Sequence, residues 1–174
     1  MKTTKKVTLS AMATALGAVI MLLGSVIEVL DFTVCAMASL LVVFIYLEIG
    51  SYYPWLVWIC TTLTTALIYS GSLVWIEYLL IFGIYPLIKA YIERLPRWSW
   101  LIVKLLYINV MAWAIFLIGE VLLGFPVVGE ETLPLKILLY VMLNVAFVAY
   151  DFFITTMVRV YLVKLRPKLK SLLK

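Results

Sequence analysis

The basic residues of this chain gather at a few positions separated by long apolar runs. All but Lys136 of its 14 Lys and Arg residues fall at the start, in the middle or at the end. These groups are Lys2, Lys5 and Lys6; Lys89, Arg94, Arg97 and Lys104; and Arg159, Lys164, Arg166, Lys168, Lys170 and Lys174. Because cytoplasmic loops of membrane proteins are enriched in Lys and Arg, this spacing predicts a topology as well as a fold.

The composition indicates that lipid is the solvent for most side chains. Apolar residues make up 66% of the chain and charged residues 13%, against about 45–50% and about 25% in soluble domains. A chain of 174 residues cannot hide so much apolar surface in a core bounded by water. Because the basic residues lie at membrane edges, we expect the net charge of +5 to attract anionic membrane lipid rather than nucleic acid.

Six apolar runs approach the length of about 20 residues that a membrane-spanning helix needs. We therefore predict an all-α, polytopic integral membrane protein in which residues 1–174 form a single domain. The predicted spans are residues 8–27, 33–49, 54–70, 73–91, 98–123 and 134–162, followed by a basic tail at 163–174. Six spans place both termini on one side, and the positive charges assign that side to the cytoplasm. The tail either anchors the last helix at lipid headgroups or docks a cytoplasmic partner.

Several polar side chains are expected at similar depth in the outer half of the membrane. Counting about 1.5 Å per residue from the nearest cytoplasmic charge places Glu77 and Asn109 about 18 Å above the inner edge. By the same count Asn144 lies at about 22 Å and Trp113 at about 24 Å, in a hydrocarbon core about 30 Å thick.

One interpretation of this layer is a ligand pocket, because a carboxylate in hydrocarbon is costly unless it is paired or hydrated. The candidate lining residues are Glu77, Trp75, Tyr78, Asn109, Trp113 and Asn144, and the residues of covering loops are Glu28, Asp31 and Glu120. The acidic and aromatic side chains would suit a cationic small molecule. In the alternative, the Asn side chains bond between helices and the aromatic residues form an interfacial belt.

A second polar pair is expected nearer the cytoplasm. Lys104 and Asp151 fall roughly 10–12 Å above the inner edge, on consecutive antiparallel spans. We predict that they form an intramembrane ion pair. The alternatives are that the Lys104 ammonium extends toward the cytoplasmic headgroups or that the pair belongs to a proton relay.

Several kinds of chemistry are excluded from this chain taken alone. It has no His, and its two cysteines, Cys35 and Cys60, lie inside apolar runs without a CxxC motif. A zinc site and a His-based catalytic triad are therefore excluded, and no GxxxxGK[ST] motif provides an ATP site. Asp151 has no second acidic residue at matching depth in the first three spans. We expect no metal, no cofactor and no enzymatic activity.

The start of the chain carries a resemblance to a known family. Lys5 and Lys6 precede a first span in which Ala11 and Ala15 lie on one helix face. In this, and in length and topology, the chain resembles the S components of energy-coupling factor (ECF) transporters. The resemblance implies a six-helix protein of the bacterial cell membrane that captures a vitamin or metal in an outward-facing pocket. It also implies that Ala11 and Ala15 contact a transmembrane coupling subunit, which works with two ATPase subunits.

A different class of function stays open beside this one. The chain is also similar in size and topology to the rod-shape protein family called MreD, which implies a membrane scaffold of a cell-envelope assembly. A ligand held in a cavity of the outer half would favour the transport subunit, whereas a dry and solidly packed interior would favour the scaffold.

Overall fold

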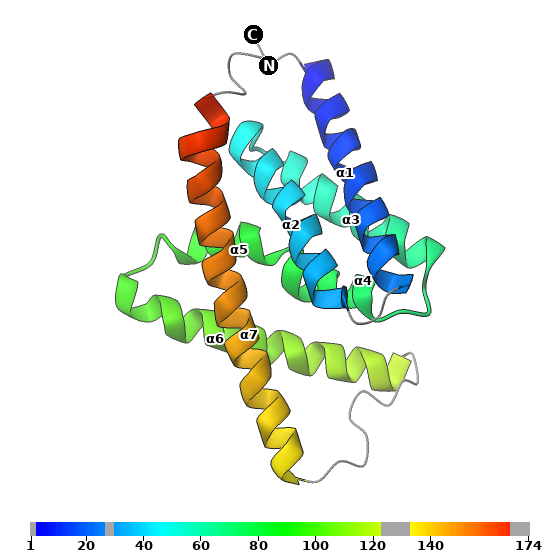
Figure 1. Cartoon of the computed structure of the whole chain (residues 1–174), viewed down its shortest axis with the longest axis vertical. Helices are drawn as coiled ribbons and strands as arrows, with labels where there is room; N and C mark the ends of the chain where they lie inside the picture. Colours follow the sequence, from blue (N-terminus) through cyan, green and yellow to red (C-terminus); the bar gives the residue numbers. More distant parts are fainter. Residues whose placement is uncertain (1–2, 27–29, 123–132, 168–174) are drawn as a thin grey trace. The chain divides into compact units, whose positions relative to one another are not determined.

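The computed structural model describes residues 3–26, 30–122 and 133–167. All regular secondary structure in this part of the chain is helical. The elements are α1 (Thr3–Val26), α2 (Asp31–Glu48), α3 (Tyr53–Ile68), α4 (Val74–Glu77), η2 (Tyr78–Phe82), α5 (Tyr85–Ile92), α6 (Arg97–Leu117), η3 (Ile118–Leu122), α7 (Leu133–Val160) and η4 (Tyr161–Leu165) (Figure 1). The η elements are wide π-type turns that continue or join α-helices.

These elements match the six predicted spans closely, with α4, η2 and α5 together forming the fourth. Within the described residues, five helical segments are long and apolar enough to cross a membrane, and α3 is a shorter apolar helix. The prediction of an all-α, multi-pass membrane protein is therefore confirmed. The period of the sequence pattern alone could not distinguish the π-type turns from ordinary helix.

The chain divides into two compact units, Met1–Glu131 and Thr132–Lys174. In the part that the structure describes, the first unit holds α1 to α6 with η2 and η3, and the second holds α7 and η4. The expected single domain and the cytoplasmic location of both termini stay predictions. Glu28 and residues 168–174 of the expected tail lie outside the described residues.

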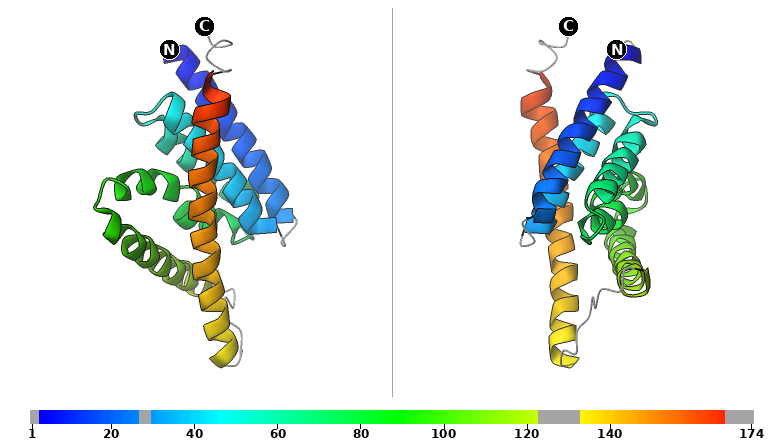
Figure 2. Two further views of the ribbon diagram at one scale, coloured as in Figure 1. Left: turned by 60° about the vertical axis from the view of Figure 1, so that its left-hand side comes forward. Right: turned by 90° about the vertical axis from the view of Figure 1, so that its right-hand side faces the viewer.

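Helices α1, α2 and α3 lie side by side in the first unit (Figures 1 and 2). Glycines permit this close approach. A Cβ atom on Gly24 would lie 2.0 Å from Cγ2 of Val34 on α2, and one on Gly17 would lie 3.2 Å from Thr61 on α3. The small residues of α1 therefore pack against helices of the same chain at these two points, as small residues commonly do in membrane proteins.

The wide turn η2 is a contact point for α3. The N–H of Gly83 donates to the Tyr78 carbonyl at 2.7 Å, five residues back, which is the bonding pattern of a π-type turn. The indole Nε1 of Trp58 on α3 donates to the Leu79 carbonyl at 3.2 Å. A Cβ on Gly83 would lie 2.5 Å from Trp58 Cδ1, so the absence of a side chain there lets the indole approach.

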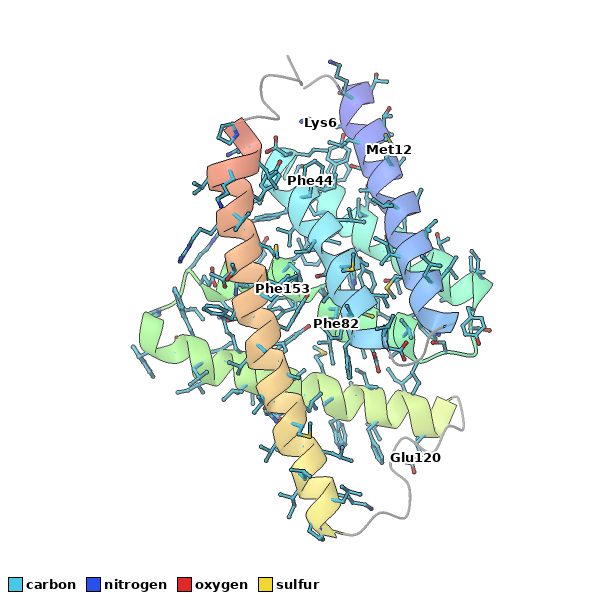
Figure 3. All side chains as sticks on the ribbon, in the orientation of Figure 1. Lys6, Met12, Phe44, Phe82, Glu120 and Phe153 are labelled. Atoms are coloured by element: carbon cyan, nitrogen blue, oxygen red, sulfur yellow. The ribbon has the colours of Figure 1, made fainter. Side chains whose placement is uncertain are left out.

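Within the first unit, helix α6 packs against η2 and α5. The Tyr107 hydroxyl donates to the Leu80 carbonyl of η2, and the Tyr107 and Tyr85 ring centroids are 5.6 Å apart. Figure 1 shows α6 running at a steep angle to α1 and α2. On the side of η2 toward α2, Phe82 lies 5.8 Å from Phe32 between ring centroids (Figure 3). The turn η2 of the fourth span thus packs against α2, α3 and α6.

Candidate functional site

Two acidic side chains of the first unit are part-buried, and each has one buried carboxylate oxygen. Asp31 is the first residue of α2, where a negative charge is favoured by the free N–H groups of the helix start. Glu77 is the last residue of α4, and the two carboxylates are close enough to interact electrostatically. The Glu77 Oε2 atom is buried and accepts no hydrogen bond. The structure thus brings together two of the residues predicted for the pocket.

Cys35 extends this acidic pair along α2. It lies four residues after Asp31, and therefore on the same helix face, and its side chain is fully buried. Its Sγ atom lies 3.9 Å from Met21 Sδ and 3.7 Å from the Val74 carbonyl oxygen. It is within electrostatic range of both carboxylates. In the sequence, Cys35 is distinguished only by its position inside an apolar run, four residues after Asp31, and that spacing is the signal for its place beside the carboxylate.

Two buried hydroxyl groups complete the polar cluster. Tyr78, a predicted site residue, is fully buried, and its hydroxyl is within electrostatic range of Cys35. Thr61 on α3 is also fully buried, and its hydroxyl is close to that of Tyr78 without reaching hydrogen-bonding geometry. We call Asp31, Cys35, Thr61, Glu77 and Tyr78 the acidic cluster. Thr61 was not predicted, because neither its depth nor its polarity distinguishes it from the other threonines of α3.

The other predicted pocket residues of α4, α6 and η3 are exposed or donate to a carbonyl nearby in the sequence. Trp75 Nε1 donates to the Ser70 carbonyl at 3.4 Å, and Asn109 Nδ2 donates to the Leu105 carbonyl of α6 at 2.7 Å. Trp113 is exposed, as is Glu120, which points away from α2 (Figure 3).

Asn144 is on α7 in the second unit, where Nδ2 donates to the Tyr140 carbonyl at 2.9 Å. A role for Trp75, Asn109, Trp113, Asn144 and Glu120 in ligand binding stays a prediction.

The second expected polar site contains an acidic residue that the depth count missed. Lys104 Nζ lies 3.6 Å from Glu93 Oε1, and Lys89 Nζ lies 3.4 Å from the same oxygen. Glu93 could have been found from its position four residues after Lys89. Asp151 belongs to the second unit, so its pairing with Lys104 stays a prediction.

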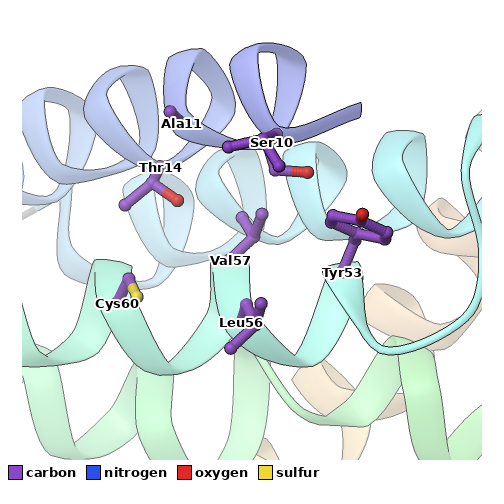
Figure 4. Close-up of a pocket in the computed structure, with 8 residues that line it drawn as sticks. Ser10, Ala11, Thr14, Tyr53, Leu56, Val57 and Cys60 are labelled. Atoms are coloured by element: carbon purple, nitrogen blue, oxygen red, sulfur yellow. The ribbon is translucent and has the colours of Figure 1, made fainter. Parts of the chain in front are cut away.

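Ala11 and Ala15 are both exposed on α1. Ala11 also borders a groove of about 180 Å³ between α1 and α3 (Figure 4). The lining residues of this groove, which we call the α1–α3 groove, are Val7, Ser10, Ala11, Thr14, Tyr53, Leu56, Val57 and Cys60. Its exposed lining is almost entirely apolar. Ala15 lies one turn further along α1, outside the groove.

Comparisons of the chain with protein-family models, with curated proteins and with solved structures gave no match. Among the described residues, no group of three or more Cys, Asp or Glu side chains is arranged to hold a metal ion. The function therefore has to be argued from the chemistry of the acidic cluster and of the exposed helix faces.

Proposed function

We propose that this chain is the membrane-embedded, substrate-binding subunit of an uptake transporter of the ECF type, and that it captures a small cationic molecule from outside. The observation that carries the proposal is the pair of carboxylates, Asp31 and Glu77, within the helices of the first unit. Ionisable residues inside membrane proteins are costly and are usually retained for a function.

A cationic ligand would balance the main electrostatic cost of this site. Two carboxylates at close range repel each other, and a low-dielectric interior strengthens that repulsion. A ligand ammonium group between Asp31 and Glu77 would replace the repulsion with two attractive, charge-assisted contacts. The hydroxyls of Tyr78 and Thr61 could bond to polar atoms elsewhere on the ligand, and the sulfur atoms of Cys35 and Met21 would provide a polarisable wall.

The exposed face of α1 supports the second half of the proposal, which is association with a coupling subunit. Of the two alanines that the resemblance assigns to this contact, the proposal rests on Ala15, which is exposed outside the α1–α3 groove and leaves the helix backbone open to close approach by another helix, as small residues do at many membrane interfaces. The sequence has no GxxxxGK[ST] motif, so in this mechanism ATP is hydrolysed by partner chains.

The proposed binding of a cationic ligand is tested by the variant Glu77→Gln, which keeps the shape of the side chain and removes its charge. The full chain is purified in lipid nanodiscs, and the small molecules it releases on denaturation are identified by mass spectrometry. We expect an amine-bearing compound from the native protein, and at least about tenfold less of it from Glu77→Gln, equivalent to about 1.4 kcal/mol or more of binding free energy.

The matched control is Glu48→Gln, at the opposite end of α2 from Asp31 and about 26 Å along the helix. It should release as much compound as the native protein. The melting temperature of each variant shows whether it is folded. A folded Glu77→Gln protein that releases the native amount would contradict the ligand site.

The proposed association with a coupling subunit is tested by affinity purification of the tagged chain from its native membrane, followed by identification of its partners. We expect a transmembrane coupling subunit and ATPases with the native chain, and fewer of them with Ala15→Leu, because the larger side chain blocks close approach. Met12→Leu changes another exposed residue of α1 at nearly constant volume and should have no effect. Recovery of envelope-building proteins alone would instead favour the MreD-like scaffold.

A further inference from the structure

The α1–α3 groove is an apolar recess on the first unit of this multi-pass membrane protein. Ser10, Ala11 and Thr14 on α1 have short side chains, which leave space beside Leu56 and Val57 of α3 (Figure 4). An empty recess of this kind forfeits the dispersion contacts that its walls would make with a neighbouring molecule. In a membrane, a lipid acyl chain is the flexible apolar molecule always present to fill it.

Positive charge lies at one end of the groove. The Lys6 ammonium is 6.0 Å from the ring centroid of Tyr53, and Tyr53 lines the groove. Lys5 is exposed one residue earlier on α1. Two lysines at the membrane edge attract anionic headgroups, and their long side chains allow the ammonium groups to reach the headgroup level.

We propose that the α1–α3 groove binds one anionic phospholipid, with an acyl chain against Ala11 and the headgroup beside Lys5 and Lys6. A volume of about 180 Å³ suits part of one acyl chain, whereas a helix with its side chains, about 10 Å across, is too wide to enter. Ala15 lies outside the groove, so the lipid site can be separated by mutation from the proposed contact with a coupling subunit. The lipid site does not depend on the proposed transport function.

The groove is tested with phosphatidylglycerol that carries a photoreactive group in its acyl chain. The full-length protein is placed in nanodiscs containing this lipid, illuminated, and digested for mass spectrometry. We expect labelled peptides from α1 and α3 around residues 7–14 and 53–60. Ala11→Phe should fill the groove and lower labelling of these peptides at least about tenfold, equivalent to about 1.4 kcal/mol of lost binding.

Ala15→Phe is the matched control, because it adds the same ring one turn further along α1 and outside the groove. It should label like the native protein. Equal labelling of the two variants would overturn the proposal, as would native labelling confined to other helices. A photoreactive amino acid at position 11 that crosslinks to protein rather than to lipid would show that the groove is a protein contact, and would also overturn it.

The headgroup contact is tested by the double variant Lys5→Gln/Lys6→Gln, compared in phosphatidylglycerol and phosphatidylcholine with the same photoreactive chain. The native protein should label more strongly with the anionic lipid. The double variant should lose this preference and keep acyl-chain labelling with phosphatidylcholine. A preference that survives the double substitution would overturn the proposed headgroup site.

Discussion

At the scale of single residues, the position of Glu77 relative to Asp31 is the finding with the clearest functional meaning. The two carboxylates lie far apart in the sequence, and the fold brings both near Cys35 and Tyr78. Hydrocarbon offers no water to solvate these groups, so their energy depends on what else enters the site. A ligand that brings positive charge would therefore be held by carboxylates that each already have one oxygen buried in the protein.

A second single-residue effect concerns the contact between α1 and α2. We expect Gly24→Ala to lower the free energy of unfolding by about 1–3 kcal/mol, the usual range for overpacking, because the new Cβ would lie 2.0 Å from Val34 Cγ2. Thermal unfolding in detergent would measure this. Gly71→Ala is the control, since a Cβ there meets no atom within 4 Å. Adding Val34→Ala to Gly24→Ala should recover part of the loss, and a double variant no more stable than Gly24→Ala would contradict this explanation.

At the scale of elements, α3 is notable for its length. Its 16 residues extend about 24 Å, less than the hydrocarbon thickness of about 30 Å. Aromatic side chains mark both ends: the stacked rings of Tyr52 and Tyr53, 4.5 Å apart, precede the helix or begin it, and Tyr69 follows it. Such rings prefer the membrane interface, so they favour a bilayer that is locally thin around α3.

The length of α3 predicts a dependence on bilayer thickness. We expect the melting temperature of the full chain to be higher in nanodiscs of phosphatidylcholines with shorter acyl chains, because a thinner core matches α3 with less distortion. The expected cost is a fraction of a kcal/mol per Å of mismatch. A melting temperature that rose steadily with acyl-chain length would show that α3 does not limit the match.

At the scale of the whole molecule, the distribution of Lys and Arg predicts which loops face the cytoplasm. Single cysteines replacing Lys2, Arg94 and Lys174, in a chain whose native cysteines are replaced by Ser, should resist a membrane-impermeant thiol reagent in intact cells. A cysteine at Gly129 should react. The enrichment of Lys and Arg on the cytoplasmic side places both termini in the cytoplasm, and this arrangement requires an even number of spans. A reaction at residue 2 or 174 without lysis would contradict the six-span topology.

The sequence alone determined the class of the protein, its six helical segments and their approximate ends. These follow from local properties, since apolar length and the position of charges do not depend on which helix neighbours which. Counting residues from the nearest cytoplasmic charge also predicted a depth for Glu77 in the membrane. Depth is a coordinate along a helix, however, and does not specify the direction in which a side chain points around the helix axis.

Only the tertiary structure decided which polar groups meet. With α1 close to α2 at Gly24 and to α3 at Gly17, Cys35 is buried near the two carboxylates and Thr61 is buried near Tyr78. The tertiary structure also places Glu93 beside Lys104, an ion-pair partner that counting residues along the helices did not find. The basic residues that separate the apolar runs thus reveal where the helices begin and end, whereas side-chain packing determines which faces those helices turn toward each other.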